Sequence, residues 1–444
     1  MRNLHWTGHP GVPLIAAGGE QRISVKAMLG KQVIILGGGV VGLSTALHLQ
    51  RRGIASVVVH RADIRLAASY GNGGLIQREA VFPYRFPRAV RPLLRMMRNR
   101  SIDVSYEPAA LPGLAARLLR YWAASAETPY ARTVEATAPL IASCLDEHRD
   151  LADEVGAAAL LRPIGWHRAY TTAEGLEAAI AVAEHAKAAY DVNFRVVGPD
   201  ALASEEPSFR ARRAGAIHWT DSLSLSDPGA LLGAYRARFE ETGGEVIDAD
   251  AMQVERHGAG WRLRHATGAV EGSEVVVAMG AASAALARRF GISVPLFGKR
   301  GYHMHYHLRD GERLNRPILD DESGFLLSPM AKGVRLTTGV EFARPGRAPT
   351  PIQLERAEKV AGRLIPIAGR AEPAPWMGTR PCMPDMLPVI GCSHRLPGLW
   401  MGFGHGHQGM TLGPTTGRLL AEMIAGVPPF LKVDAYSPDR FARR

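Results

Sequence analysis

A glycine-rich turn between an apolar strand and a helix constrains this chain more than any other feature. The apolar run 32–36 leads into Gly37, Gly39 and Gly42 of a GxGxxG pattern, after which apolar residues repeat at helical spacing. Glycines at these positions allow a tight turn, a close backbone approach to a pyrophosphate and close packing of helix on strand. A second apolar run at 56–59 completes a βαβ unit, so the segment predicts a dinucleotide-binding site at the helix N-terminus.

The end of the second strand departs from the usual dinucleotide-binding pattern. An Asp or Glu commonly accepts the ribose hydroxyls there, whereas this chain has His60, followed by Arg61 and, a little further on, Asp63. Both His60 and Asp63 can hydrogen-bond a ribose hydroxyl. The sequence therefore leaves the ribose contact open.

The nucleotide-binding pattern is interrupted and returns later in the chain. After the stretch 69–74, a segment rich in proline and arginine replaces the expected strand–helix units. A buried strand occurs at 274–281, and a second glycine-rich turn at 402–409 leads into a C-terminal helix. We therefore expect a discontinuous domain, in which the second helix N-terminus faces the electron-rich edge of a reduced flavin.

Four stretches of the chain resemble the FAD-dependent D-amino acid dehydrogenases and oxidases, a group that contains glycine oxidase and sarcosine oxidase. They are the turn at 37–42, the stretch Ser69-Tyr70-Gly71-Asn72-Gly73-Gly74, the motif Gly378-Thr379-Arg380-Pro381 with 384–391, and the turn at 404–409 with its helix. The run 299–303 is most similar to the bacterial D-amino acid and D-hydroxyproline dehydrogenases.

The resemblance implies an α/β fold with a discontinuous Rossmann-like FAD-binding domain and an α+β substrate domain whose sheet is mostly antiparallel. The implied FAD-binding domain comprises 28–80, 215–296 and 373–444, and the implied substrate domain comprises 81–214 and 297–372. Residues 1–27 precede the first convincing strand, and we expect an irregular extension there.

The same resemblance implies which residues contact FAD. They are Gly37, Gly39, Val40, Val41, Gly42, His60, Arg61, Ser69, Asn72, Gly73, Gly74, Gly280, Gly404, His405, Gln408, Gly409, Met410 and Thr411. Oxidation of an amine beside a carboxylate also requires a clamp for that carboxylate. Arg380 is our candidate, because a guanidinium binds a carboxylate through two hydrogen bonds. The competing interpretation is an arginine that binds only backbone carbonyls.

Tyr302 and His303 are the other candidate catalytic residues. The Tyr302 hydroxyl is a candidate second contact to the substrate carboxylate. His303 is a candidate for proton traffic near the amine, because histidine titrates near neutral pH. Each is equally compatible with a packed strand residue.

The implied reaction is oxidation of a D-amino acid or a cyclic imino acid, such as one of the D-proline or D-hydroxyproline type, to an imino acid. A hydride passes from the α-carbon to flavin N5, and the electrons then pass to a quinone or another acceptor. A glycine- or sarcosine-type oxidase that forms hydrogen peroxide is the alternative. A tRNA-modifying flavoprotein is a more distant one, prompted by the net charge of +11. The basic residues are dispersed, without an aromatic stacking platform, so we expect no nucleic-acid partner.

The cysteines and histidines form no recognisable metal motif. The 3 cysteines include no CxxC pair, which argues against a disulfide framework and a cysteine-built zinc site. His303, His305 and His307 would share one face of a strand, and His405 and His407 flank one glycine. Neither cluster contains a carboxylate, so we expect no metal.

The segment 84–100 combines six arginines with apolar residues. Such a surface can rest on anionic lipid. The commoner explanation is a solvated face whose apolar side packs inward, and we expect that arrangement here. The chain contains no run of 18 uncharged apolar residues and no secretory pattern. We therefore expect a cytoplasmic protein, with peripheral contact at the inner membrane as the alternative, and the sequence leaves the oligomeric state open.

Overall fold

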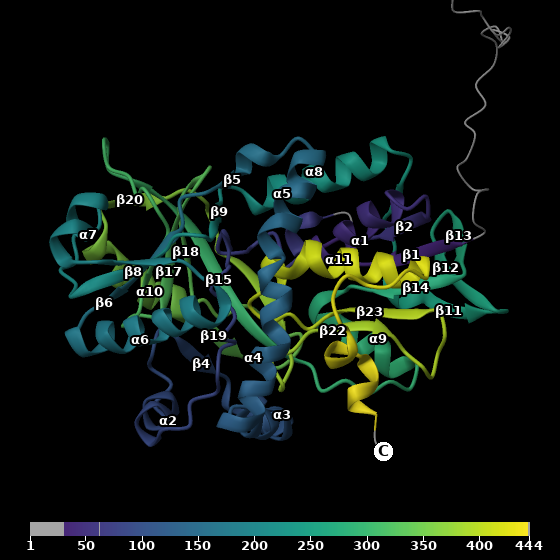
Figure 1. Cartoon of the computed structure of the whole chain (residues 1–444), viewed down its shortest axis with the longest axis horizontal. Helices are drawn as coiled ribbons and strands as arrows, with labels where there is room; N and C mark the ends of the chain where they lie inside the picture. The colour runs from purple at the N-terminus through teal and green to yellow at the C-terminus, as the bar shows by residue number, and fades with distance from the viewer. Residues whose placement is uncertain (1–30, 62, 443–444) are drawn as a thin grey trace, which may run out of the picture.

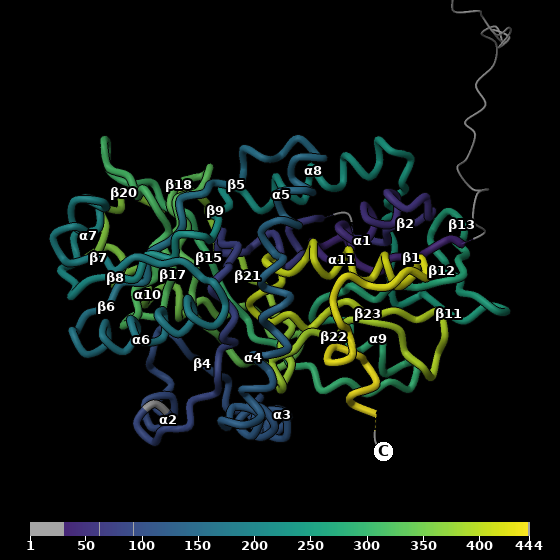
Figure 2. The backbone as a smooth tube through the Cα atoms, viewed as in Figure 1, coloured from purple at the N-terminus to yellow at the C-terminus, as the bar shows by residue number. Residues whose placement is uncertain are grey.

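A computed structural model describes residues 31–61 and 63–442, and the expected extension at 1–27 lies outside them. Two large β-sheets occupy opposite ends of the molecule (Figure 1). The colour sequence along the backbone shows that the chain crosses between the two ends several times (Figure 2). Each end is therefore built from segments that are distant in the sequence.

The first sheet is mainly parallel, with the strand order β10-β2-β1-β14-β23-β22. Its strands are β1 (Gln32–Leu36), β2 (Ala55–Val59), β10 (Glu245–Ile247), β14 (Glu274–Val277), β22 (Val389–Cys392) and β23 (Leu399–Phe403). Val33 of β1 packs with the helices α1 (Val40–Gln50) and α11 (Gly409–Ala425), whereas Ile34 belongs to the apolar core on the opposite face. Burial on both faces explains why these strands are nearly continuous apolar runs.

Further elements cover the two faces of this sheet. Helices α5 and α8 lie beside α1 and α11, and α9 covers the other face together with a sheet of β11, β12 and β13. The other helices of the described residues are α2 (Val90–Met97), α3 (Leu111–Ala124), α4 (Glu127–Ala142), α5 (Cys144–Glu154), α6 (Ala173–Tyr190), α7 (Pro199–Glu205), α8 (Pro228–Glu241), α9 (Ser283–Arg289) and α10 (Ile352–Leu364). The covering sheet comprises β11 (Val254–His257), β12 (Gly260–His265) and β13 (Gly268–Gly272).

Helices α1 and α11 pack unusually closely because α11 presents glycines to α1. A Cβ on Gly413 would lie 2.5 Å from a methyl carbon of Val40, and one on Gly417 would lie 2.6 Å from the carbonyl carbon of Ser44. Both distances are shorter than a van der Waals contact. The glycines therefore let the N-termini of the two helices converge.

We expect Gly417→Ala to destabilise the protein by about 1–3 kcal/mol, because the new methyl group would force the two helix backbones apart. Gly233 on α8 is the matched control, since nothing lies within 4 Å of the Cβ it would gain. Gly233→Ala should be neutral or stabilise the protein by up to about 1 kcal/mol. Urea unfolding of both variants measures the difference, and equal free energies of unfolding would contradict the close-packing argument.

The second sheet has eleven strands in the order β4-β19-β15-β18-β17-β16-β6-β8-β7, with β20 and β21 also paired to β15. The pairs β16–β6 and β19–β4 are parallel, and the other pairs are antiparallel. Its strands are β4 (Val104–Tyr106), β6 (Trp166–Tyr170), β7 (Phe194–Val197), β8 (Gly215–Trp219), β15 (Phe297–Leu308), β16 (Ile318–Asp320), β17 (Phe325–Met330), β18 (Gly333–Thr337), β19 (Val340–Phe342), β20 (Ile367–Arg370) and β21 (Trp376–Cys382). A small sheet of β3 (Leu75–Ile76), β9 (Leu223–Leu225) and β5 (Leu161–Arg162) adjoins these elements.

The expected fold class is confirmed, because a mainly parallel, discontinuous sheet accompanies a mostly antiparallel one. The βαβ unit and the C-terminal helix lie where the sequence predicts them. Two strands pair in a different sheet from the one that the expected domain boundaries imply. Strand β8 was expected within 215–296 and β21 within 373–444, yet both pair in the second sheet. Hydrogen bonds between distant segments decide this assignment, and the division into two domains stays a proposal.

Candidate active site

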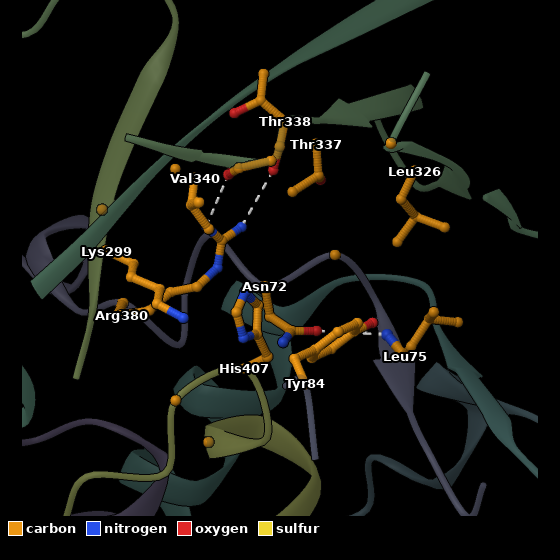
Figure 3. A pocket seen from close by; sticks show the side chains of 18 of the residues that line it. Asn72, Leu75, Tyr84, Lys299, Leu326, Thr337, Thr338, Val340, Arg380 and His407 are labelled. Atoms are coloured by element: carbon orange, nitrogen blue, oxygen red, sulfur yellow. Dashed lines mark hydrogen bonds between the residues drawn. The ribbon is translucent and has the colours of Figure 1, made fainter. Parts of the chain in front are cut away.

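A cavity of about 480 Å³ lies where the N-termini of α1 and α11 meet the second sheet (Figure 3). Its wall comprises the first residues of both helices, parts of the stretch 68–77, the loop 84–87 and residues of β15 and β21. Ligands of doubly wound folds commonly bind outside the carboxyl ends of the parallel strands. The cavity lies at that edge of the first sheet.

The two helix N-termini carry no negative charge of their own. Val40 and Val41 begin α1, Gly409 and Met410 begin α11, and all four residues line the cavity. Neither helix has a side-chain cap or an acidic residue in its first turn, although the backbone N–H of Val40 donates to the Ser69 hydroxyl at 3.2 Å. Because a helix N-terminus favours negative charge, this arrangement fits a phosphate at α1 and an electron-rich ring edge at α11.

The first glycine turn is closed on one side and open on the other. A Cβ on Gly42 would lie 1.8 Å from the carbonyl oxygen of Gly37, so only glycine fits between the turn and the helix. A Cβ on Gly39 would approach only the Ser69 hydroxyl, at 3.3 Å. The open space beside Gly39 is where the GxGxxG pattern places the pyrophosphate.

Of the two ribose candidates, His60 lies against the turn. A Cβ on Gly38 would be 2.7 Å from Cγ of the His60 ring, whose Nε2 is buried without a hydrogen-bond partner among the described residues. Burial lowers the pKa of His60, which favours the neutral ring. Asp63 is occupied by Arg65, which donates to both of its carboxylate oxygens at 2.8 and 2.9 Å, and Arg61 is exposed. The geometry favours His60 for the ribose, which stays a prediction.

The stretch 69–74 is held in place from two sides. The Asn72 side-chain oxygen accepts hydrogen bonds from the backbone N–H groups of Gly74 at 2.8 Å and Leu75 at 3.4 Å (Figure 3). The buried guanidinium of Arg335 on β18 donates to the carbonyl oxygen of Asn72 and, at 3.4 Å, to that of Tyr70. These contacts present Asn72 and the neighbouring Gly73 to the cavity.

Arg380 is a cation in the cavity wall without an acidic partner. Its guanidinium donates to the carbonyl oxygens of Gly339 at 3.0 Å and Thr338 at 3.3 Å (Figure 3). No carboxylate of the described residues lies within 4.0 Å of its nitrogens. Burial lowers the pKa of Arg380, but an arginine keeps its charge in proteins. A Cβ on Gly301 would lie 2.3 Å from the guanidinium, so Gly301 makes the space that Arg380 occupies.

Lys299 is a second cation in the same wall, where it is buried, and no sequence motif indicated a role for it. The β15–β21 ladder places it directly opposite Arg380. Its Nζ lies 4.4 Å from the centre of the Tyr121 ring and 3.4 Å from the Tyr121 hydroxyl. Burial lowers the pKa of Lys299, and the charge of Arg380 lowers it further. Like charges on facing residues destabilise a sheet, so this pair favours a bound anion.

Tyr302 does not present its hydroxyl to the cavity as we expected. The hydroxyl donates to Glu341 at 2.6 Å and accepts a hydrogen bond from the backbone N–H of Thr350 at 2.9 Å. The ring packs in the apolar core that also contains Met304 and Tyr306. Because successive side chains of a strand point to opposite faces, the side chains of Lys299 and Tyr302 leave β15 in opposite directions, although both residues contribute to the cavity lining. These partners occupy the Tyr302 hydroxyl in this structure, which disfavours the expected contact with a substrate carboxylate, and that contact stays a prediction.

His303 lies behind the cavity wall rather than in it. Its ring stacks on Trp376 with a distance of 4.8 Å between ring centres. Burial lowers the pKa of His303 well below its ordinary value, so the ring stays neutral. We find no contact that brings it to the amine of a substrate in this cavity. Its neighbour Trp376 does line the cavity, so His303 is placed to position that ring.

The histidine cluster on β15 includes a carboxylate from outside the strand. His303, His305 and Glu372 lie close enough to share one ion, whereas His307 is exposed. However, the His305 ring hydrogen-bonds Glu372 at 2.9 Å and accepts from the Arg335 guanidinium at 3.0 Å. A cation at this position would face the Arg335 charge, so we propose no metal there.

The second glycine turn contributes further side chains to the site. His405 lines the cavity, and its Nε2 lies 2.9 Å from the Thr416 hydroxyl, while burial lowers its pKa to about 4. His407 packs against Tyr84 with 4.9 Å between the ring centres, and both line the cavity. Burial, followed by the charges of Arg380 and Lys299, lowers the pKa of His407 well below its ordinary value. Sequence reasoning missed Tyr84 and His407, because their meeting depends on tertiary contacts.

Hydrogen bonds connect the second turn to the end of the stretch 68–77. The backbone N–H of Gln77 donates to the Thr411 hydroxyl at 3.2 Å, and the Gln408 amide donates to the Gln77 side-chain oxygen at 3.2 Å. Gly404 has a positive φ of 89° and packs against Met383. Gly280, with a positive φ of 56°, begins the short 3-10 helix after β14.

The structure thus brings some of the predicted residues to one cavity and places the others around it. Those that line the cavity are Val40, Val41, Ser69, Asn72, Gly73, Tyr302, Arg380, His405, Gly409 and Met410. Those outside its lining are Gly37, Gly39, Gly42, His60, Arg61, Gly74, Gly280, His303, Gly404, Gln408 and Thr411. Their roles in holding the cofactor stay predictions.

We expect the buried His148 of α5 to make the protein less stable in acid. Its Nε2 lies 2.7 Å from the carbonyl oxygen of Met410, and burial lowers its pKa from 6.5 to about 4. The unfolded chain takes up a proton at this histidine near pH 6.5, whereas the folded protein does so only near pH 4. Protonation therefore favours the unfolded chain, and the free energy of unfolding falls as the pH decreases from 6.5 toward 4. The loss between pH 7 and pH 5 is about 2 kcal/mol. Urea unfolding at both pH values should show a smaller loss for His148→Gln, and an unchanged loss would contradict the assignment. Substitution of the exposed His307 by glutamine is the control.

The first sheet is mainly parallel and has two helix N-termini at its carboxyl edge, and the mostly antiparallel second sheet supplies two cations, Lys299 and Arg380. This combination defines a dinucleotide-binding protein with a site for an anion. The family model described as FAD dependent oxidoreductase (DAO) matches residues 32–423. The chain belongs to this family, and it is an FAD-dependent oxidoreductase.

Curated relatives and solved structures agree with this membership. The chain is 29% identical over 424 residues to a D-amino-acid oxidase of Bradyrhizobium diazoefficiens, covering 93% of this chain and 99% of that protein. It is 28% identical over 420 residues to a D-amino acid dehydrogenase of Methylobacterium radiotolerans, covering 92% and 99%. Glycine oxidase from Geobacillus kaustophilus has a similar fold, with a TM-score of 0.69 and 20% identity over 93% of this chain and all of that one (100%).

The residues present fit the expected cofactor. A phosphate fits the open space beside Gly39, and an electron-rich ring edge fits the uncapped N-terminus of α11. A ribose fits the Nε2 of His60, which has no hydrogen-bond partner among the described residues. The backbone of the first turn would hold the pyrophosphate, and α11 would face the ring.

Proposed function

We propose that this protein oxidises a D-amino acid or a cyclic imino acid at the bond between its α-carbon and nitrogen, giving an imino acid. One observation carries the proposal: Arg380 is a half-buried cation in the cavity wall, with no acidic partner among the described residues. An uncompensated buried charge is costly, so a carboxylate ligand is the natural partner for it. The named relatives that act on D-amino acids support this choice of substrate.

The chain's own residues position the substrate and control its charge. Arg380 binds the carboxylate, with Lys299 opposite it as a second source of positive potential. The same two charges disfavour a protonated amine nearby, so the substrate nitrogen is held neutral, as the oxidation requires. His407 stays neutral beside them and adds no competing charge. When bound, FAD supplies the acceptor for the two electrons and the hydrogen.

An anaerobic absorption experiment tests the proposal. The purified protein is expected to be yellow and to bleach when one member of a panel of D- and L-amino acids, D-proline, D-hydroxyproline and sarcosine is added. Bleaching by a D-amino or imino acid supports the proposal. Bleaching only by L-amino acids, or by none of the panel, would contradict it.

The same samples identify the electron acceptor. We propose a quinone or a comparable acceptor, so turnover should be fast with a quinone analogue and slow with oxygen. Rapid formation of hydrogen peroxide in air, with glycine or sarcosine as the preferred substrate, would instead identify the glycine- or sarcosine-type oxidase.

A further inference from the structure

Two short helices at one edge of the molecule expose apolar side chains to solvent. On α2, Val90, Leu94 and Met97 are 69%, 54% and 70% exposed, and their spacing puts them on one helix face. The expectation that the apolar side of the segment 84–100 packs inward is therefore wrong for these three residues, whereas Phe86, Leu93 and Met96 of the same segment are half-buried. On α3, Leu119 and Trp122 are 65% and 38% exposed. We call these five residues the apolar patch.

Helices α2 and α3 lie at the same edge of the molecule (Figure 1), and contacts between their segments connect them. The Arg88 guanidinium lies 4.0 Å from the centre of the Trp122 ring and donates to the Trp122 carbonyl oxygen at 2.8 Å. At the other end of α2, the Tyr106 hydroxyl of β4 donates to the Met97 carbonyl oxygen at 2.7 Å. Helix α3 begins shortly after β4. The two helices therefore project from one linked substructure.

Arginines surround the apolar patch. The segment 80–126 contains eight arginines, and its acidic residues before Glu127 are only Asp103 and Glu107. Asp103 pairs with Arg95, and Glu107 binds Arg344 and Arg347 from outside the segment. Among the exposed arginines of the segment that have no ion pair within the described residues, three lie in α2 or directly after it, namely Arg91, Arg98 and Arg100. We call these three the basic ridge.

We propose that this edge docks onto an anionic lipid bilayer, with the apolar patch inserted at the headgroup level and the basic ridge against the lipid phosphates. Exposed apolar side chains at helical spacing with flanking arginines are the pattern of a helix that lies in the membrane interface. A second copy of this chain would present the same positive charge, which disfavours it as the partner. None of the helices in the described residues is long and apolar enough to cross a membrane, so the contact is peripheral.

The docking surface adjoins the cavity. Met96 lies on α2 beside the apolar patch, Tyr121 lies on α3, and both residues line the cavity wall. Docking would therefore bring one side of the cavity close to the membrane surface. The inference does not depend on the proposed substrate, because it rests on a surface outside the cavity.

Vesicle sedimentation of the full-length flavoprotein tests the inference. We expect binding to phosphatidylcholine vesicles that contain about one third phosphatidylglycerol, weaker binding at high salt, and little binding to phosphatidylcholine alone. Arg91→Gln/Arg98→Gln/Arg100→Gln should weaken binding on the order of 100-fold, since each basic residue contributes roughly a factor of five at an anionic surface. Val90→Ser/Leu94→Ser/Met97→Ser should weaken it by roughly tenfold or more.

Matched controls remove the same groups elsewhere. Arg309→Gln/Arg313→Gln/Arg363→Gln removes three exposed arginines, and Val182→Ser/Val196→Ser/Val427→Ser removes three apolar side chains that are 52%, 43% and 46% exposed. Both controls should bind vesicles as the unchanged protein does.

Each alternative occupant gives a different result. Equal binding to neutral and anionic vesicles, or no binding to either kind, would overturn the proposal. Unchanged binding by the variants of the apolar patch and of the basic ridge would overturn it as well. Self-association in light scattering that the patch variants abolish would assign the surface to a second copy instead. Flavin reduction by substrate in solution should be the same in all variants, so failure of the docking is distinguishable from failure of the proposed reaction.

Discussion

Arg380→Ala is expected to raise the KM for the amino acid substrate on the order of 100-fold while the protein still binds flavin. The substitution removes a charge-assisted pair with the carboxylate, which corresponds to about 3 kcal/mol. Arg380 is outside the turns that are expected to hold the cofactor, so the ratio of flavin to protein should not change. Steady-state kinetics with an artificial electron acceptor, together with the absorption spectrum, measure both quantities.

Two comparisons separate a carboxylate clamp from a merely structural arginine. The unchanged enzyme should prefer an amino acid to the matching amine without a carboxylate, and Arg380→Ala should lose most of that preference. Loss of the hydrogen bonds to Thr338 and Gly339 would lower stability but would not change the preference. Arg380→Lys should bind the substrate better than Arg380→Ala does, because lysine keeps the positive charge. It should bind less well than the unchanged enzyme, because lysine cannot form the paired hydrogen bonds of a guanidinium with a carboxylate. An unchanged KM in Arg380→Ala would make the clamp assignment wrong.

Gly39→Val is expected to yield a folded protein without flavin. The backbone of Gly39 is extended, with φ −81° and ψ −177°, so a valine fits without strain. Its Cβ would meet only the Ser69 hydroxyl, at 3.3 Å, and the side chain would fill the space expected for the pyrophosphate. Absorbance of the flavin relative to the protein should fall to near zero, while the far-ultraviolet circular dichroism spectrum should remain that of the unchanged protein.

Gly42→Ala provides the contrast to Gly39→Val. A Cβ at Gly42 would lie 1.8 Å from the backbone oxygen of Gly37, so this variant should lose stability as well as flavin. Gly233→Val, on the exposed side of α8, should keep both. A yellow Gly39→Val variant with normal flavin content would contradict the role assigned to the turn.

Local patterns predicted the parts of the fold that depend on neighbouring residues. The glycine turn, its flanking strand and helix, and the C-terminal turn and helix lie where the sequence placed them, because steric limits on the backbone and apolar periodicity act over a few residues. Membership of the family followed from motifs of the same kind. Local patterns do not predict which strands from distant segments pair with each other. Strands β8 and β21, for example, pair in the second sheet.

The two glycine turns that are expected to hold the cofactor, and Arg380 as a candidate clamp, could be identified from the residues alone. Which polar groups of β15 are available to a ligand, and which are hydrogen-bonded elsewhere, depends instead on the packing of distant segments. This strand is buried along most of its length on both faces, so alternation of apolar and polar residues could not distinguish Lys299 from Tyr302. Likewise, the apolar spacing on α2 and α3 is the same whether that face packs inward or meets solvent. The choice in each case depends on which segments pack against the element, and those segments are distant in the chain.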